Sequence, residues 1–257
     1  MFLNGKTVIV TGGSNGMGKA IAKRLCQEGA NVVISGRNQE RLQSAKKEME
    51  TFPGQVLTVA MDVREVDQVE QMVQKTKEAF GKIDSLVNNA AGNFVVPAED
   101  LSFNGWHSVV NIVLNGTWYC SQTVAKDWIA NGQTGSILNI VATYAWTGAA
   151  GVVHSASAKA GVLAMTQTLA VEWGSKYGIR VNAIAPGAIE DTGGTEKLIA
   201  NEKAAQFLKG QIPLKRFGRP EEIASLAHFL LSEEAEYING ECVTMDGGFW
   251  LSGMRFL

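Results

Sequence analysis

The stretch TGGSNGMG, residues 11–18, decides the fold, because it closes a short apolar run and opens an amphipathic segment of helical period. Its glycines at positions 12, 16 and 18 let the backbone approach a pyrophosphate, and a helix N-terminus offers free N–H groups to such an anion. The spacing G-x-x-x-G-x-G differs from the general dinucleotide fingerprint G-x-G-x-x-G. A glycine-rich turn can be no more than a tight turn, but one placed between a first strand and a helix favours a dinucleotide site.

On both sides of this stretch, short apolar runs alternate with longer segments of helical period. The runs predict strands at 7–10, 31–35, 56–61, 85–88, 136–141, 180–184 and 242–245. The segments between them predict helices at 17–28, 39–51, 66–80, 103–130, 155–176 and 220–232. Most runs are apolar throughout, as is typical of parallel strands covered on both faces. The alternation predicts one doubly wound α/β domain over residues 1–257, with a mostly parallel seven-stranded sheet.

The composition limits the class of partner. Lys and Arg total 23 against 25 for Asp and Glu, so we expect neither a nucleic acid nor an anionic membrane as partner. No apolar run has the roughly 18 residues of a membrane span, and the opening MFLNGKTVIVTGG lacks a signal-peptide pattern. The cysteines at 26, 120 and 242 are widely separated, which argues against disulfides and a zinc site. We expect a cytoplasmic protein with buried thiols, no metal and a small-molecule partner.

The end of the second predicted strand bears on the choice of cofactor. An acid about 20 residues past the glycine-rich loop would hydrogen-bond a free ribose hydroxyl, whereas an arginine suits a 2′-phosphate. NVVISGRNQE (31–40) has Gly36 and Arg37 at this place, and its first acid is Glu40. The residues therefore favour NADPH over NADH, although Arg37 could also only begin a solvated helix face.

Five motifs in chain order carry a resemblance to a known family. They are TGxxxGxG at 11–18, NNAAG at 88–92, the lysine of HSASAKAG at 154–161, NAIAPG at 182–187 and YINGECVTMDGG at 237–248. Together they resemble the short-chain dehydrogenase/reductase family over essentially the whole chain. The resemblance implies a single Rossmann-type NAD(P)-binding domain, assembly as a homotetramer and catalysis by an Asn-Ser-Tyr-Lys set.

The catalytic set of that family is only partly present. Lys159 stands in its usual place, but Ser155 replaces the tyrosine four residues earlier, and a serine hydroxyl is a much weaker acid than a phenol. The family's serine falls on Ala142, and its asparagine falls on Val113 if Gly116 is the matching glycine. These departures disfavour an ordinary carbonyl reductase. Either the domain is a cofactor-binding sensor or scaffold, or its acid comes from another segment.

A subgroup of the family suggests where such an acid lies. NNAAGNF (88–94), IVLNGT (112–117), TYAWTG (143–148) and SASAKAG (155–161) resemble the 2,4-dienoyl-CoA reductases. In that subgroup the catalytic tyrosine follows the fifth strand and matches Tyr144, the lysine matches Lys159, and a substrate-binding asparagine matches Asn93. Ser155 belongs to the subgroup's pattern.

This resemblance implies NADPH-dependent reduction of 2,4-dienoyl-CoA to 3-enoyl-CoA in the β-oxidation of unsaturated fatty acids. Hydride would reach C5, and negative charge would spread to the thioester oxygen as a dienolate, with C2 protonated from water. Tyr144 and Asn93 would donate hydrogen bonds to that oxygen, where one donor typically contributes about 3–4 kcal/mol. Lys159 would hold the nicotinamide ribose and favour negative charge on the phenol.

Each of these side chains also has an ordinary structural explanation. Tyr144 could pack under Trp146, and Asn93 could serve a turn, because asparagine tolerates left-handed backbone. Ser155 could cap a helix. His154 invites a role as general base, but its two valine neighbours favour a structural role.

Cofactor contacts are expected in the glycine-rich loop and at the strand ends. Asp62 suits an adenine contact through its carboxylate, although an aspartate at a strand end is also ordinary turn chemistry. The expected contact residues are Gly12, Ser14, Asn15, Gly16, Met17, Gly18, Arg37, Asp62, Val63, Asn89, Ala90, Lys159, Pro186, Gly187 and Ile189. Thr192 is a weaker candidate for the carboxamide or the pyrophosphate.

Two further segments bear on the substrate and on assembly. Residues 189–217 are expected to form a substrate lid. Its cations could attract coenzyme A phosphates, though a lysine run is usually a solvated helix face; they are Lys197, Lys203, Lys209, Lys215 and Arg216. The apolar end FWLSGMRFL (249–257) predicts a subunit interface and so supports a homotetramer.

Overall fold

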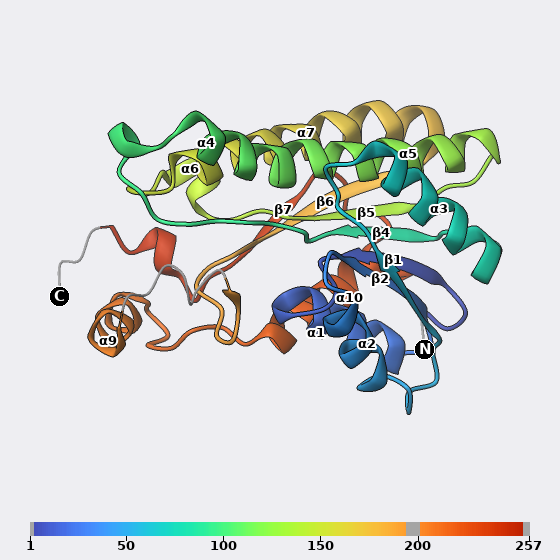
Figure 1. The fold of residues 1–257 in the computed structure, drawn as a ribbon, viewed down its shortest axis with the longest axis horizontal. Coiled ribbons are helices and arrows are strands. Elements are labelled where there is room, and N and C mark those ends of the chain that lie inside the picture. Colours follow the sequence, from blue (N-terminus) through green and yellow to red (C-terminus); the bar gives the residue numbers. More distant parts are fainter. Residues whose placement is uncertain (1–2, 194–200, 254–257) are drawn as a thin grey trace.

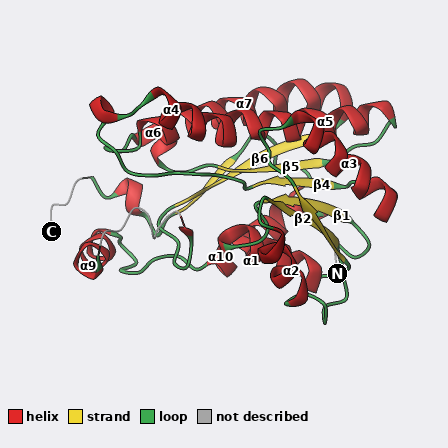
Figure 2. Cartoon of the chain, viewed as in Figure 1, coloured by secondary structure: helices red, strands yellow, loops and turns green. Residues whose placement is uncertain are grey.

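Seven parallel strands form the centre of the computed structural model, which describes residues 3–193 and 201–253 (Figures 1 and 2). The strands are β1 Thr7–Thr11, β2 Asn31–Gly36, β3 Val56–Ala60, β4 Ser85–Asn88, β5 Ser136–Ile140, β6 Arg180–Pro186 and β7 Cys242–Met245. Their order in the sheet is β3-β2-β1-β4-β5-β6-β7, and every pairing is parallel. The predicted doubly wound sheet is confirmed, and it is parallel throughout rather than mostly parallel.

Helices cover both faces of the sheet. The α-helices are α1 Gly16–Gln27, α2 Gln39–Lys47, α3 Val66–Phe80, α4 Phe103–Val110, α5 Gly116–Ala130, α6 Tyr144–Thr147, α7 Val153–Tyr177, α9 Glu202–Gln211 and α10 Pro220–Leu231. Shorter turns are η1 Ala98–Asp100, η2 Asn111–Asn115, η3 Glu233–Ala235 and η4 Phe249–Leu251. In Figure 1, α3, α4, α5 and α7 lie above the sheet, and α1, α2 and α10 lie below it.

The core explains why the strands are mostly apolar. Val8 and Val10 of β1 pack in the cluster that holds α1 and α10, whereas Ile9 between them packs in the cluster that holds α3 and α5. Alternate side chains of a strand point to opposite faces, so a strand covered on both sides has apolar residues on both faces. Buried polar exceptions are hydrogen-bonded, as Asn88 of β4 is to Asn139 of β5 at 2.9 Å. No helix of the described residues is long and apolar enough to cross a membrane.

The predicted helix at 103–130 is the main correction to the expected elements. It is interrupted by η2, a π-helical turn over Asn111–Asn115, where the Asn115 amide donates to Asn111 Oδ1 at 2.9 Å. A π-turn adds one residue to the helix, and this addition hardly changes the periodicity of apolar residues in the sequence. The predicted helix at 39–51 is also shorter, since α2 ends at Lys47.

The loops that carry the expected site all leave the same edge of the sheet, because the carboxyl ends of parallel strands lie together. Residues 12–15 follow β1, residues 89–97 follow β4, residues 141–143 follow β5, and residues 187–193 follow β6. Ligands of doubly wound sheets bind outside this edge.

Candidate active site

The glycine-rich loop forms a cradle that side chains would fill. A Cβ on Gly18 would lie 2.3 Å from the Asn89 amide nitrogen and 2.4 Å from the Gly12 carbonyl oxygen. Gly12 and Gly16 have φ values of 65° and 51°, which disfavour other residues. Asn15, at the N-cap of α1, makes no side-chain cap, and no acid lies in the first turn. The positive end of α1 is therefore available to a phosphate, and the cradle fits the pyrophosphate of a nicotinamide cofactor.

Asn89 and Ala90 hold this loop against the end of β4. The Asn89 amide donates to the carbonyl oxygens of Thr11 and Gly12, at 3.0 and 3.2 Å. The backbone N–H groups of Asn89 and Ala90 donate to the Thr11 hydroxyl, at 3.1 and 3.0 Å. The side chain of Asn89 is thus used to shape the loop, and direct contact of Asn89 or Ala90 with the cofactor stays a prediction.

Gly18→Ala is expected to destabilise the protein by about 1–3 kcal/mol and to weaken cofactor binding, because the new methyl group meets backbone that cannot move away. Glycine to alanine within a helix otherwise stabilises by up to about 1 kcal/mol. Gly210→Ala in α9 is the matched control, since a Cβ there meets nothing within 4 Å. Urea unfolding of both variants checks the signs, and a shift in the same direction for both would contradict the steric argument.

At the end of β2, the structure brings Ser14 and Gly36 together beside Arg37. A Cβ on Gly36 would lie 3.6 Å from Ser14 Oγ, and Arg37 is exposed. Within the described residues no ion pair involves Arg37, although its charge helps to lower the pKa of Asp62. An exposed arginine directly after Gly36 is a suitable partner for a 2′-phosphate.

The sequence did not anticipate Arg64 as the partner of Asp62. Arg64 donates to both carboxylate oxygens, with Nη2 to Oδ2 at 2.6 Å and Nε to Oδ1 at 3.0 Å. This hydrogen-bonded pair holds the pKa of Asp62 below its usual value. The carboxylate expected to meet adenine is therefore already engaged by an arginine two residues later.

The loop after β6 crosses to the glycine-rich loop. The Thr192 methyl lies 3.4 Å from the position of a Gly16 Cβ, and the Thr192 hydroxyl donates to the Ile189 carbonyl at 2.8 Å. Pro186 is buried, and the Gly187 N–H donates to Met245 at 3.0 Å. The residues expected around the nicotinamide thus come from a loop tied to both β7 and the cradle.

The Tyr144 hydroxyl lies beside Ser155, the residue that stands where the family has its tyrosine. Tyr144 opens the single turn of α6, Ser155 lies buried in the first turn of α7, and their hydroxyl oxygens are 3.1 Å apart. Burial raises the pKa of the Tyr144 phenol, and the hydrogen bond with Ser155 opposes that shift. The phenol therefore keeps its proton at neutral pH and can donate it or share it.

Lys159 lies one helical turn beyond Ser155 on the same face of α7. Its ammonium is buried and donates to the backbone carbonyl of Ile140 at the end of β5. Burial lowers the pKa of Lys159 to about 8. The ammonium donates to that carbonyl, and no carboxylate pairs with Lys159 in residues 3–193 and 201–253.

Asn93 is oriented by its own backbone. Its Oδ1 accepts the Phe94 N–H at 2.9 Å, which leaves the amide NH₂ as the group that can donate outward. Its loop contacts the start of α7 in two places. The Val96 N–H donates to the Gly151 carbonyl oxygen at 3.0 Å, and the Phe94 ring packs edge-to-face against the His154 ring. The loops that carry Asn93 and Tyr144 therefore both flank the start of α7.

His154 itself is fully buried, and neither ring nitrogen has a partner among the described residues. Its ring lies against Phe94 with the centroids 4.5 Å apart. This environment supports the structural role over that of a general base.

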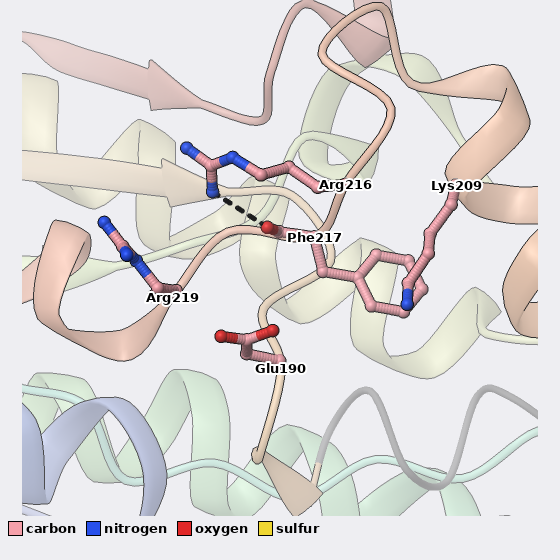
Figure 3. Close-up of a pocket in the computed structure, with 5 residues that line it drawn as sticks. All are labelled: Glu190, Lys209, Arg216, Phe217 and Arg219. Carbon is pink, nitrogen blue, oxygen red and sulfur yellow. Dashed lines mark hydrogen bonds between the residues drawn. The ribbon is translucent and has the colours of Figure 1, made fainter.

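The expected lid is described only in part, because residues 194–200, which include Lys197, lie outside the described residues. A pocket of about 190 Å³ is lined mainly by residues of its described part, and the lining residues are Glu190, Lys209, Arg216, Phe217 and Arg219. Figure 3 shows these side chains. Arg216 donates to both carboxylate oxygens of Glu222, and the Lys209 ammonium lies 5.0 Å from the centre of the Phe217 ring. These two cations are thus already engaged within the protein.

A parallel doubly wound sheet with a glycine cradle at its first helix, and a tyrosine and a lysine at the end of its fifth strand, defines a nicotinamide-dependent oxidoreductase. Residues 12–250 match the family described as enoyl-(acyl carrier protein) reductase. The chain belongs to the short-chain dehydrogenase/reductase family.

Its relatives include several dienoyl-CoA reductases. A Bacillus subtilis (strain 168) protein named as a probable 2,4-dienoyl-CoA reductase, (2E)-enoyl-CoA-producing, is 60% identical over 98% of this chain and 99% of its own length. The peroxisomal 2,4-dienoyl-CoA reductase of Danio rerio, (3E)-enoyl-CoA-producing, is 41% identical over 97% of this chain and 83% of its own. The crystal structure of a Bacillus anthracis short chain dehydrogenase, 60% identical, has a TM-score of 0.90 over 98% of this chain and 99% of that one.

Proposed function

We propose that this protein reduces 2,4-dienoyl-CoA thioesters with NADPH and produces 3-enoyl-CoA. The observation that carries the proposal is the 3.1 Å contact between Tyr144 and Ser155, one turn before the buried Lys159. It supports an acid supplied by α6 in the place where the family normally has a tyrosine on α7. The names of the Bacillus subtilis and Danio rerio relatives support the substrate.

The residues of the site would have two roles, cofactor binding and stabilisation of negative charge. The glycine cradle, Arg37 and Lys159 would hold the cofactor, which supplies a hydride when bound. Tyr144 and Asn93 each present a donor, and we assign both to the thioester oxygen, where the charge of the dienolate gathers. Donors fixed in place before the reaction stabilise such charge without reorganising. The ammonium of Lys159 lowers the cost of charge on the Tyr144 phenol.

The product depends on where the dienolate takes its proton. Protonation at C2 gives a 3-enoyl thioester, and protonation at C4 gives a 2-enoyl thioester. We assign C2, as the resemblance to the subgroup implies. We assign water as the acid, because both side-chain donors are used at the thioester oxygen. The name of the Bacillus subtilis relative favours the second product, so this point needs its own measurement.

Turnover in D₂O separates these proposals. NADPH oxidation with 2,4-hexadienoyl-CoA is expected to be much faster than with ketones or a 3-oxoacyl thioester, the substrate class named for a Thermotoga maritima relative. NMR of the product is expected to show deuterium at C2 and a 3,4 double bond. Deuterium at C4 would overturn the product while leaving the substrate intact. Cofactor binding without reduction of any acyl-CoA would instead support the sensor or scaffold.

Arg37→Ala is expected to weaken NADPH binding about 10- to 100-fold and to leave NADH binding unchanged, since a charge-assisted hydrogen bond to the 2′-phosphate is lost. Arg41→Ala is the matched control, because Arg41 is a second exposed arginine near the end of β2. Titration calorimetry with both cofactors measures the effect. NADH binding as tight as NADPH, unaltered in Arg37→Ala, would remove the proposed preference.

Assembly, location and the lid complete the proposal. We infer a homotetramer, because the apolar residues Trp250 and Leu251 are exposed and suit a subunit interface. Met254, Phe256 and Leu257 of the same expected interface lie outside the described residues. A cytoplasmic location and a role in the β-oxidation of unsaturated fatty acids follow the sequence interpretation. Residues 189–217 remain our candidate for the lid of a single catalytic domain.

A further inference from the structure

Two tryptophans from distant parts of the chain meet at the rim of the site. Trp146 belongs to α6, two residues after Tyr144, and Trp250 belongs to η4. Their ring centroids are 5.9 Å apart at an interplanar angle of 87°, and the side chains remain 37% and 42% exposed. In Figure 1 the red turn of η4 lies at the left, between α6 above it and α9 below it.

The turn that carries Tyr144 has little stability of its own. α6 is a single turn without a side-chain cap, and a helix so short is not stable alone. Exposed residues follow it, and Gly148 and Gly151 have positive φ. Positions two apart on a helix point about 200° from each other, so Tyr144 and Trp146 face opposite sides. Contacts on both sides must therefore hold the turn: Tyr144 on Ser155, and Trp146 on Trp250.

The partner tryptophan is anchored to the sheet. Asp246, directly after β7, accepts the N–H groups of Gly248 and Trp250, each at 2.8 Å. Asp246 also lies close to the loop after β6, since a Cβ built on Gly187 would be 2.7 Å from the Cβ of Asp246. Trp250 is thus an anchored surface against which the Trp146 side of α6 rests.

We propose that Trp250 and Trp146 are positioning residues that aim the Tyr144 hydroxyl at the reacting oxygen. Trp250 is held by Asp246, its ring holds Trp146, and the ring contact keeps α6 in the orientation that presents the phenol beside Ser155. This inference rests on the proposed role of Tyr144 in reducing a dienoyl-CoA, and it adds the C-terminal segment to that machinery.

A double-mutant cycle tests the coupling. Trp250→Ala is expected to lower kcat for 2,4-hexadienoyl-CoA about 2- to 10-fold, the contribution typical of an edge-to-face pair, with the Kd for NADPH unchanged. Trp250→Phe should recover most of the loss, because it keeps an aromatic ring for Trp146 to contact. In a Tyr144→Phe background, Trp250→Ala should have no further effect, since the hydroxyl to be aimed is absent. Tyr237→Ala, at an exposed aromatic residue of the turn after η3 and outside the proposed subunit interface, is the control and should match the wild type.

Hydrogen exchange provides a readout that does not depend on turnover. Trp250→Ala should speed amide exchange in residues 144–151 of the unliganded protein, and Tyr237→Ala should not. Equal losses from Trp250→Ala with and without the Tyr144 hydroxyl, or unchanged exchange in this segment, would overturn the positioning role. If the wild-type protein reduces no dienoyl-CoA, the proposed function fails, whereas the exchange result still decides whether Trp250 holds α6.

Discussion

Tyr144→Phe is expected to lower kcat for a 2,4-dienoyl-CoA by about 10²- to 10³-fold while changing the Kd for NADPH by less than about twofold. In the proposed mechanism the phenol acts on charge that develops in the transition state, so its loss should appear in turnover and not in cofactor binding. Its hydroxyl oxygen faces Ser155, and burial raises its pKa, so it is a protonated donor across the neutral range. Steady-state kinetics and a fluorescence titration with NADPH measure the two quantities.

Changes at Ser155 are the matched controls. Ser155→Ala should be much milder than Tyr144→Phe, because it removes only a partner of the phenol. Ser155→Tyr should not rescue Tyr144→Phe, since Ala142 and Val113 stand where the family has its serine and asparagine, and position 155 is buried against α6. If Tyr144→Phe keeps most of the activity while Ser155→Ala abolishes it, the acid has been assigned to the wrong residue.

Lys159→Met is expected to lower activity about 10²-fold or more and at the same time to stabilise the fold at neutral pH. The unfolded chain keeps the lysine pKa near 10.5, whereas burial lowers it to about 8 in the folded protein. Below pH 8 both states are charged, and the folded state bears the full desolvation cost of about 3 kcal/mol. Methionine removes that cost but leaves the Ile140 carbonyl unpaired, so a net gain of about 1–2 kcal/mol is expected.

The stability gained by Lys159→Met should depend on pH. Between pH 8 and 10.5 the unfolded state holds more protons on Lys159, so the wild-type free energy of unfolding rises with pH in that window. The advantage of Lys159→Met should therefore shrink as pH rises from 8 to 10.5. Urea unfolding at pH 7 and pH 10 measures it. A variant no more stable than the wild type at pH 7 would mean that the buried ammonium is fully compensated.

The fold could be predicted from sequence because its physical signals are local. Strands covered on both faces are largely apolar on both, and the seven predicted runs fall within one or two residues of the observed strands. The π-turn at 111–115 could not be predicted in this way, because one extra residue hardly disturbs a helical pattern. α6 was missed for a similar reason, since a four-residue turn is too short to show a period.

The candidate site could be predicted from the sequence only in part. The glycine spacing and the lysine pointed to the cradle and to Lys159, and the resemblance supplied Tyr144 and Asn93. The partnership of Asp62 with Arg64 and the use of Asn89 to shape the loop depend on which side chains face each other, which one sequence does not reveal. The same holds for Trp146 and Trp250, which only the folded chain brings together.

The contact of Tyr144 with Ser155 also restricts how such an enzyme can evolve. Position 155 is 1% exposed, and its hydroxyl oxygen already lies 3.1 Å from the phenol, so a tyrosine there would collide with the one on α6. A lineage that exchanges one arrangement for the other cannot carry both phenols in place. It must either lose the phenol it has before it gains the other, and so pass through a form without a positioned phenol, or change both segments together. The two segments are therefore expected to change together among such enzymes.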